Sequence, residues 1–180
     1  MLTSCLNGIK TVGYRFAILT NHFYPLSNAL YIQVAMSIIQ EIKESWGWVG
    51  INPTEIVGEN DFGNLMIKDT EGKYWRLCPE DVYCEIIAED RDSLDRLSTE
   101  RDFLEDWYMS VLVEQATAEY GPLEAGHKFH LTIPGVLGGE YAVSNIKPVP
   151  ITEQIRFSGS IGKQIKELPD GAEIQLKVVD

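Results

Sequence analysis

The chain has 180 residues, a net charge of −12, a hydrophobic fraction of 44% and an aromatic fraction of 10%. This length suits one compact domain, which can bury a sizeable core without a disulfide or a metal ion. The acidic balance argues against direct binding of nucleic acid or of an anionic membrane surface, because both require clustered Lys and Arg. A partner with a basic surface is favoured, although many proteins are acidic simply to stay dispersed.

The cysteines and the N-terminal stretch indicate a cytoplasmic protein. Cys5, Cys78 and Cys84 are odd in number and irregular in spacing, so they do not predict a disulfide framework. Cys78 and Cys84 are best interpreted as small buried thiols. No apolar run approaches the length of a membrane span. The weak apolar stretch at 14–19 contains Arg15 and leads to no clear cleavage site, so it is a poor signal peptide.

The packed domain is predicted to cover residues 36–180, because residues 1–35 show no sustained period. Ser37 and Gln40 form a capping-box pattern that predicts the start of a helix, and Gly47 can end it. Two interpretations of residues 1–35 stay open: an N-terminal arm that packs on the domain, or an extension created by a misassigned start.

Four short strands are predicted after this helix, with hairpin chemistry at Asp69-Thr70-Glu71-Gly72. The links between them are too short for parallel crossovers, so the strands form an antiparallel meander. The predicted strands span residues 55–57, 64–67, 73–77 and 82–88.

A helical region follows, with a short helix over 92–97 and a longer one over 99–119 that ends at Gly121-Pro122. Apolar side chains in the longer helix recur at three- and four-residue spacing, which predicts a buried face. Many acids then fall on the opposite, solvated face. The predicted buried side chains are Phe103, Leu104, Trp107, Tyr108, Val111, Leu112 and Ala116.

The rest of the chain adds strands and one more helix. A strand is predicted over 128–133, a loop over 134–140, an extended segment over 143–149 and a last strand over 172–179. Thr152 can cap a helix between them. The fold class is therefore α+β, a single domain with an antiparallel meander sheet and packed helices. The predicted inward side chains of the last helix are Ile155, Phe157, Ile161, Ile165 and Leu168.

Negative charge is concentrated between Glu85 and Glu119. This segment contains eleven acidic residues and three arginines, so it carries −8 of the total charge of −12. This concentration favours a directed electrostatic face over uniform solubilisation. We expect the helical acids in this segment to contact a partner. They are Asp92, Asp95, Glu100, Asp102, Glu105 and Asp106.

Two further groups are candidates for partner contact. Trp46 or Trp48 can anchor an interface, because Trp is favoured at binding hot spots, although tryptophans are more often part of the core. The alternative contact surface is the loop that contains Gly138, Gly139, Glu140 and Tyr141.

The candidates for chemistry are few, and we predict neither an enzyme nor a bound metal or cofactor. His127 and His130 are three apart on a predicted strand, so they face opposite sides and cannot chelate one ion together. Gly135, Gly138 and Gly139 lack the Lys-Ser or Lys-Thr of a phosphate-binding loop. Close pairs of carboxylates are expected by chance in so acidic a chain.

Two stretches of the sequence have the pattern of a known family. They are Asp61-Phe62-Gly63-Asn64-Leu65-Met66-Ile67 with Gly72-Lys73-Tyr74-Trp75-Arg76-Leu77-Cys78-Pro79-Glu80, and Pro134-Gly135-Val136-Leu137-Gly138-Gly139 through Asn145-Ile146 to Glu153-Gln154-Ile155. Together they resemble bacterial immunity proteins of type VI secretion, in particular the domain that forms the C-terminal part of antitoxins against DNase effectors. The resemblance covers roughly residues 55–170 and its motifs are structural.

The resemblance implies an immunity protein that binds and neutralises a cognate secreted toxin, with a nuclease as the expected class. The charge analysis agrees, since a nuclease must be basic around its nucleic-acid groove and an acidic inhibitor can cover such a surface. The alternative is a non-catalytic scaffold or ligand-binding module of the cell-wall-assembly-regulator type.

Overall fold

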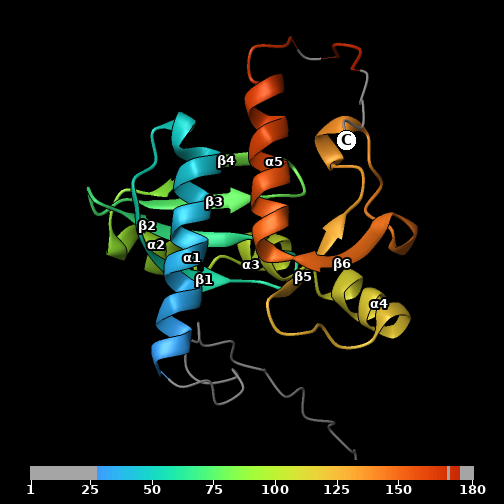
Figure 1. The fold of residues 1–180 in the computed structure, drawn as a ribbon, viewed down its shortest axis with the longest axis horizontal. Helices are drawn as coiled ribbons and strands as arrows, with labels where there is room; N and C mark the ends of the chain where they lie inside the picture. Colours follow the sequence, from blue (N-terminus) through green and yellow to red (C-terminus); the bar gives the residue numbers. More distant parts are fainter. Residues whose placement is uncertain (1–27, 170, 175–180) are drawn as a thin grey trace, which may run out of the picture.

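The computed structural model describes residues 28–169 and 171–174, and its centre is a four-stranded antiparallel sheet (Figure 1). The strands follow one another in the order β1-β2-β3-β4, which confirms the predicted meander. Residues 1–27 of the predicted N-terminal arm lie outside the described residues. The strands are β1 (Pro53–Glu59), β2 (Leu65–Asp69), β3 (Tyr74–Cys78) and β4 (Tyr83–Ala88).

The hairpin between β2 and β3 forms where its turn residues predict it. The Asp69 carboxylate accepts hydrogen bonds from the backbone N–H groups of Glu71 (2.8 Å) and Lys73 (2.9 Å). Gly72 takes a positive φ of 86°, which a side chain would disfavour. The Trp75 indole donates to the same carboxylate at 2.8 Å and so ties the turn to β3.

Helix α1 (Asn28–Trp46) begins nine residues before the start predicted from the capping box. Ser37 lies inside a continuous helix, so the prediction that it caps the helix is wrong. The segment Asn28–Met36 contains good helix formers and neither Gly nor Pro, so the helix can run through it. The predicted end is correct, because α1 passes at Gly47 into a short 3-10 helix, η1 (Gly47–Val49).

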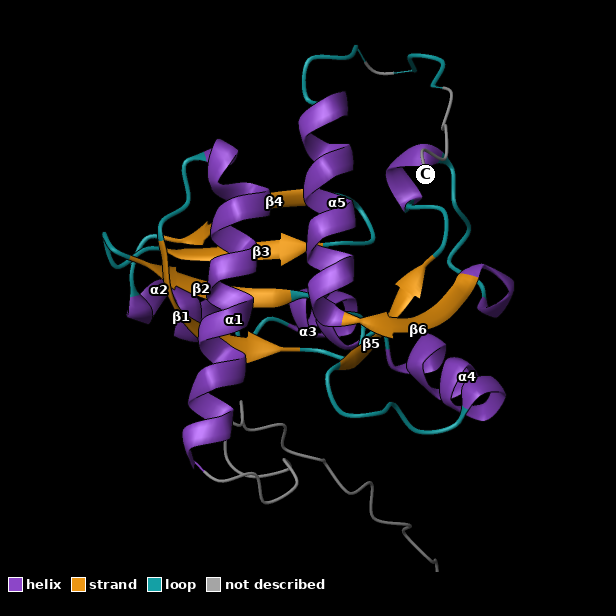
Figure 2. Ribbon diagram, in the orientation of Figure 1, coloured by secondary structure: helices purple, strands orange, loops and turns teal. Residues whose placement is uncertain are grey.

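The two faces of the main sheet are covered by different helices (Figure 2). Helices α1 and α5 (Ile151–Ile165) cover one face, where Ile42, Trp46 and Ile155 pack on Leu65 and other strand residues. Helices α2 (Arg91–Leu97) and α3 (Arg101–Tyr108) cover the other. Side chains along each strand point alternately to the two faces, and helices cover both, so side chains on both faces are buried.

A second, two-stranded sheet pairs β5 (His127–Leu131) with β6 (Ile146–Pro150) and packs on helix α4 (Ser110–Tyr120). The Gln154 amide joins this part to the main sheet, since it donates to the carbonyl oxygens of Phe62 (2.8 Å) and Phe129 (3.1 Å). Gly63 leaves room for that amide: an added Cβ would lie 2.0 Å from Gln154 Oε1. The result is an α+β fold, as predicted.

The long helix predicted over 99–119 is in fact two helices. Met109 adopts a left-handed conformation with φ of 43°, which ends α3 and starts α4. The break changes the helical phase, so Val111 is 70% exposed and not buried as predicted. Trp107 and Ala116 are buried, because each lies on the inner side of its own helix.

Helix α5 buries most, but not all, of its predicted inward residues. Ile155 and Ile161 are in the core, whereas Phe157 is 40% exposed and Leu168, beyond the helix, is 46% exposed. The structure assigns no strand at 172–174, and residues 175–179 of the predicted last strand lie outside the described part. None of the helices in the described part is long and apolar enough to cross a membrane.

Candidate functional site

The six predicted contact acids lie on two consecutive helices that cover one face of the main sheet, and all six are exposed. Asp92 and Asp102 lie in the first turns of α2 and α3, where the helix dipole also stabilises negative charge. Asp90 caps α2 by accepting from the Ser93 N–H at 2.8 Å. Some of this charge therefore serves helix formation as well.

Half of the six acids are paired with arginine. Asp95 accepts from Arg91 at 2.7 Å within α2, and Glu105 likewise accepts from Arg101 at 2.7 Å within α3. The third, Asp106, accepts from a buried arginine of β3. Within residues 28–169 and 171–174, the other three form no salt bridge and are exposed to solvent; they are Asp92, Glu100 and Asp102.

Arg76 is the buried partner of Asp106, and its side chain is only 7% exposed. Its guanidinium carbon lies 5.6 Å from the centre of the Trp107 ring and 5.8 Å from that of Tyr83, so the cation contacts two aromatic rings. Its Nε donates to Asn64 Oδ1 at 2.9 Å. Sequence reasoning missed this residue, because its position in the alternating pattern does not show that a cation would be buried there.

The Arg76 network continues into the interior through Asn64 and Glu80. Asn64 Nδ2 donates to Glu80 Oε1 at 2.5 Å, and Asn60 fixes the preceding turn by accepting from the N–H groups of Phe62 and Asn64. Burial raises the pKa of Glu80, and its second oxygen, Oε2, has no hydrogen-bond partner among the described residues. Asn60 Nδ2 also donates to the Trp107 carbonyl, which ties α3 to the β1–β2 turn.

The two candidate tryptophan anchors differ in burial. Trp46 is fully buried, and its indole donates to the Ile155 carbonyl at 3.2 Å, so it is a core residue and the anchor prediction is wrong for it. Trp48 is half-buried and stacks on Trp46 with ring centres 5.6 Å apart. The Lys166 ammonium lies 5.6 Å from the Trp48 ring centre.

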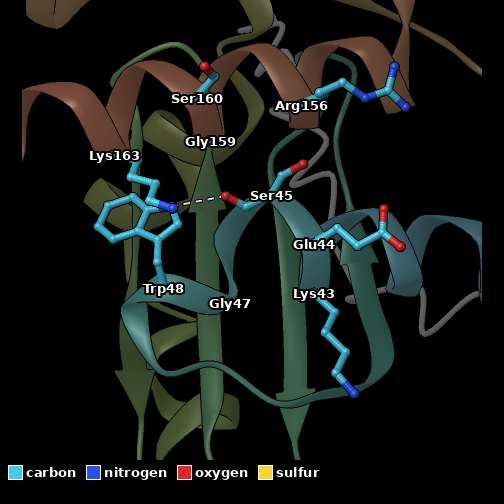
Figure 3. A pocket seen from close by; sticks show the side chains of 9 residues that line it. All are labelled: Lys43, Glu44, Ser45, Gly47, Trp48, Arg156, Gly159, Ser160 and Lys163. Atoms are coloured by element: carbon cyan, nitrogen blue, oxygen red, sulfur yellow. Dashed lines mark hydrogen bonds between the residues drawn. The ribbon is translucent and has the colours of Figure 1, made fainter.

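Trp48 lines a shallow hollow of about 320 Å³ between the end of α1 and the middle of α5 (Figure 3). Its indole donates to the Ser45 carbonyl at 2.9 Å, so the ring is held against α1. Exposed Lys43 and Lys163 and the hydroxyl of Ser160 belong to the rim. The hollow is therefore polar and lies on the sheet face opposite the acidic helices.

The predicted alternative contact loop is a fixed structure that contains the 3-10 helix η2 (Gly135–Leu137). Asn145 holds it from inside: its Oδ1 accepts from the Ile133 N–H at 3.0 Å, and its Nδ2 donates to the carbonyls of Ile133 (2.9 Å) and Glu140 (3.0 Å). Gly139 is required, because an added Cβ would lie 1.7 Å from the Ile133 carbonyl oxygen.

Two cysteines and one histidine of the described residues are buried. Cys78 and Cys84 are buried free thiols, as predicted, and burial raises the pKa of Cys84 to about 12. Burial lowers the pKa of His130 to about 4, and its ring packs edge-on against Phe157 at 5.5 Å. No three His, Cys, Asp or Glu side chains in the part of the chain that the structure describes gather to hold a metal ion.

Comparison with solved structures gives a weak similarity. The crystal structure of Atu4351 from Agrobacterium tumefaciens aligns at 16% identity with a TM-score of 0.47. The alignment covers 69% of this chain and 63% of that protein, which is less than two thirds of its length. A comparison with curated proteins gives no match.

Comparison with family models gives a specific result. Residues 88–162 match the family described as T6SS immunity protein Tdi1, C-terminal. The matched range begins at the end of β4 and reaches into α5, so it includes the acidic helices, the second sheet and the loop held by Asn145. This match supports the predicted resemblance to type VI secretion immunity proteins over residues 88–162, which contain the second of the two stretches; the first, at 61–80, lies outside the matched range.

Proposed function

We propose that this chain is a cytoplasmic immunity protein that binds a cognate toxin effector with a nuclease domain and neutralises it without catalysing a reaction. The observation that carries the proposal is the set of exposed acids on α2 and α3, which lies inside the range that matches the immunity family. A nuclease needs a basic surface to hold phosphates, and these carboxylates have the complementary charge.

The exposure of the acids suits rapid capture of the toxin. Asp92, Glu100 and Asp102 form no salt bridge with an arginine or lysine of the described residues, so no neighbouring cation offsets their field. Unpaired charges on a partner surface raise the rate of encounter with an opposite charge more than they raise the affinity. Fast encounter is what protects a cell, since free toxin acts until it is bound.

Co-expression tests the proposal directly. The toxin encoded by the neighbouring gene is induced in a host with and without this chain, and growth and complex formation by copurification are measured. We expect growth to be restored and a stable complex to be recovered. A toxic partner that is neither bound nor neutralised contradicts the proposal, and so does a gene with no toxin beside it.

Salt dependence tests the electrostatic part. Raising the ionic strength from low values to about 0.5 M shortens the screening length to a few ångströms, so association should slow by about an order of magnitude. Dissociation should change less. An association rate that does not respond to salt assigns the acids of α2 and α3 to solubility alone.

The hollow beside Trp48 supports a second candidate, a non-catalytic module that binds a small ligand. Its lining combines cationic side chains, the Glu44 carboxylate, hydroxyls and an aromatic face, which suits a polar molecule. Lys163→Glu separates the two functions, because it reverses charge in the hollow on the face opposite α2 and α3. Toxin neutralisation that is unchanged by Lys163→Glu favours the immunity function, and its loss favours a role for the hollow.

A further inference from the structure

The two contact surfaces predicted as alternatives, the acidic helices and the loop over 134–141, are connected in the structure. The connection starts at the C-terminal turn of α3, where Asp106 pairs with Arg76. The same guanidinium also lies over the ring of Tyr83, the first residue of β4, with its carbon 5.8 Å from the ring centre. Tyr83 is half-buried, so part of its ring faces solvent next to the acidic helix.

The connection continues from Tyr83 to the loop through the β3–β4 turn. The Gly135 N–H donates to the Glu80 carbonyl at 2.8 Å, which docks the loop on this turn. The Asp81 carboxylate hydrogen-bonds to the Tyr141 hydroxyl. Both groups lie against the Gly135 backbone: an added Cβ there would be 2.5 Å from Asp81 Oδ1 and 3.2 Å from the Tyr141 hydroxyl.

The loop exposes large apolar side chains although its backbone is held firmly. Val136 is 51% exposed and Tyr141 45%, and Ile133, just before the loop, is 46% exposed. Rigid apolar and aromatic groups are effective binding anchors, since little conformational freedom is lost when they are covered. About half of each side chain is exposed, and a partner can bury that area.

We propose that Asp106, Tyr83, Asp81, Tyr141 and Val136 form one continuous binding strip, in which the acids meet a basic protein surface and Tyr141 and Val136 enter an apolar recess beside it. The occupant is the toxin effector, so the inference rests on the proposed function. Charge complementarity identifies this partner, because the strip joins carboxylates to aromatic groups that contain both an apolar body and a hydroxyl.

The two ends of the strip have different kinetic roles. Carboxylates at the α3 end act at a distance and speed association, whereas buried anchors act only after contact and slow dissociation. The net charge of the strip is modest, because Asp106 is already paired with Arg76. The apolar anchors of the loop can still hold a partner tightly. The acids orient the toxin and the loop retains it.

Binding kinetics of the full chain with the catalytically inactivated toxin test the strip. Val136→Ser and Tyr141→Ala should each speed dissociation about tenfold or more, while Tyr141→Phe, which keeps the ring, should stay within about threefold of the wild type. Asp106→Asn should slow association severalfold. Matched controls on other parts of the surface are Val34→Ser on α1 (43% exposed) and Glu55→Gln on β1, which should leave both rates unchanged.

The outcomes separate the strip from the proposed function. If Val136→Ser and Tyr141→Ala bind the toxin as tightly as the wild-type chain does, the strip is overturned and the immunity function is unaffected. The strip is also overturned as a continuous surface if the substitutions at one end change neither the association rate nor the dissociation rate. If the wild-type chain forms no complex, both ideas fail together. Thermal unfolding of each variant confirms that the changes in rate come from a folded protein.

Discussion

The two faces of the main sheet are covered in different ways. On one face, α1 and α5 pack closely and bury Ile42, Trp46 and Ile155 completely. On the other, the shorter helices α2 and α3 fully bury only Leu94 and Trp107, and part of their attachment is polar. The two helical layers therefore have different roles. The layer of α1 and α5 supplies most of the buried core, and the layer of α2 and α3 presents charged side chains to solvent.

The close approach of α1 and α5 depends on a small residue. An added Cβ at Gly159 would lie 2.6 Å from the Ser45 carbonyl oxygen, so the two helix backbones are nearly in contact. The α3 layer is instead connected by hydrogen bonds from Arg76 and Asn60. Because a few directional hydrogen bonds hold this layer, its exposed side chains can be substituted with little loss of buried apolar contact.

Substitution of the paired tryptophans should produce the largest effect. Trp46→Ala removes a fully buried ring and should lower the free energy of unfolding by about 3–5 kcal/mol. Trp48→Ala removes a half-buried ring from the same stack and should lower it by about half as much. Urea denaturation measures both. Equal losses would contradict the assignment of Trp46 to the core and Trp48 to the surface.

The pH dependence of His130 should give the next largest effect. Its folded pKa of about 4 lies below the unfolded value near 6.5, so protonation favours the unfolded chain. The stability is complete above pH 6.5 and falls by about 3 kcal/mol as the pH drops to 4. His130→Phe removes the titrating group, so the gap in unfolding free energy between variant and wild type should change across this range. Parallel curves would show that His130 does not titrate as the structure implies.

Loss of Arg76 should destabilise the α3 layer. Arg76→Met keeps the length of the side chain but leaves Asn64 Oδ1 buried without a donor, which should cost about 1–3 kcal/mol. Asp106→Asn should cost less. Asp106 is 62% exposed, so the Asn side-chain oxygen or water can still accept a hydrogen bond from Arg76. Urea denaturation of the two variants distinguishes these cases. A larger loss for Asp106→Asn would mean that the ion pair, and not the buried network, holds α3.

Neutralising the unpaired acids should produce the smallest effect on stability. Asp92→Asn and Asp102→Asn remove exposed charges in first helical turns and should each cost about 0.5 kcal/mol or less. The same substitutions should reduce the salt dependence of toxin association. Thermal unfolding and association rates, measured on the same samples, separate the two contributions. A large drop in stability would assign these acids to folding.

Much of the fold could be predicted from local patterns. The meander follows from short apolar segments separated by turn residues, and the Asp69–Gly72 turn forms as its chemistry requires. The early start of α1 was missed because the pattern at Ser37 also occurs within helices. The break at Met109 was missed because no Gly or Pro marks it and a methionine rarely takes a left-handed conformation.

The candidate site was harder to predict than the fold. Exposed acids could be read from the helical period, since charge on a solvated face needs no knowledge of distant residues. The buried position of Arg76 and the docking of Tyr141 on Asp81 depend on residues 30 or more positions apart in sequence. Burial of Trp46 also depends on α5, so the sequence alone could not distinguish a core tryptophan from an anchor.

Met109 has a consequence for how this chain can diverge. By separating α3 from α4, this one residue assigns Trp107 to the core of the main sheet and Ala116 to that of the second sheet. Mutations that repack α4 can therefore accumulate without rotating the acidic helix. A chain built in this way can acquire a new binding preference in one half while the other half keeps its old geometry.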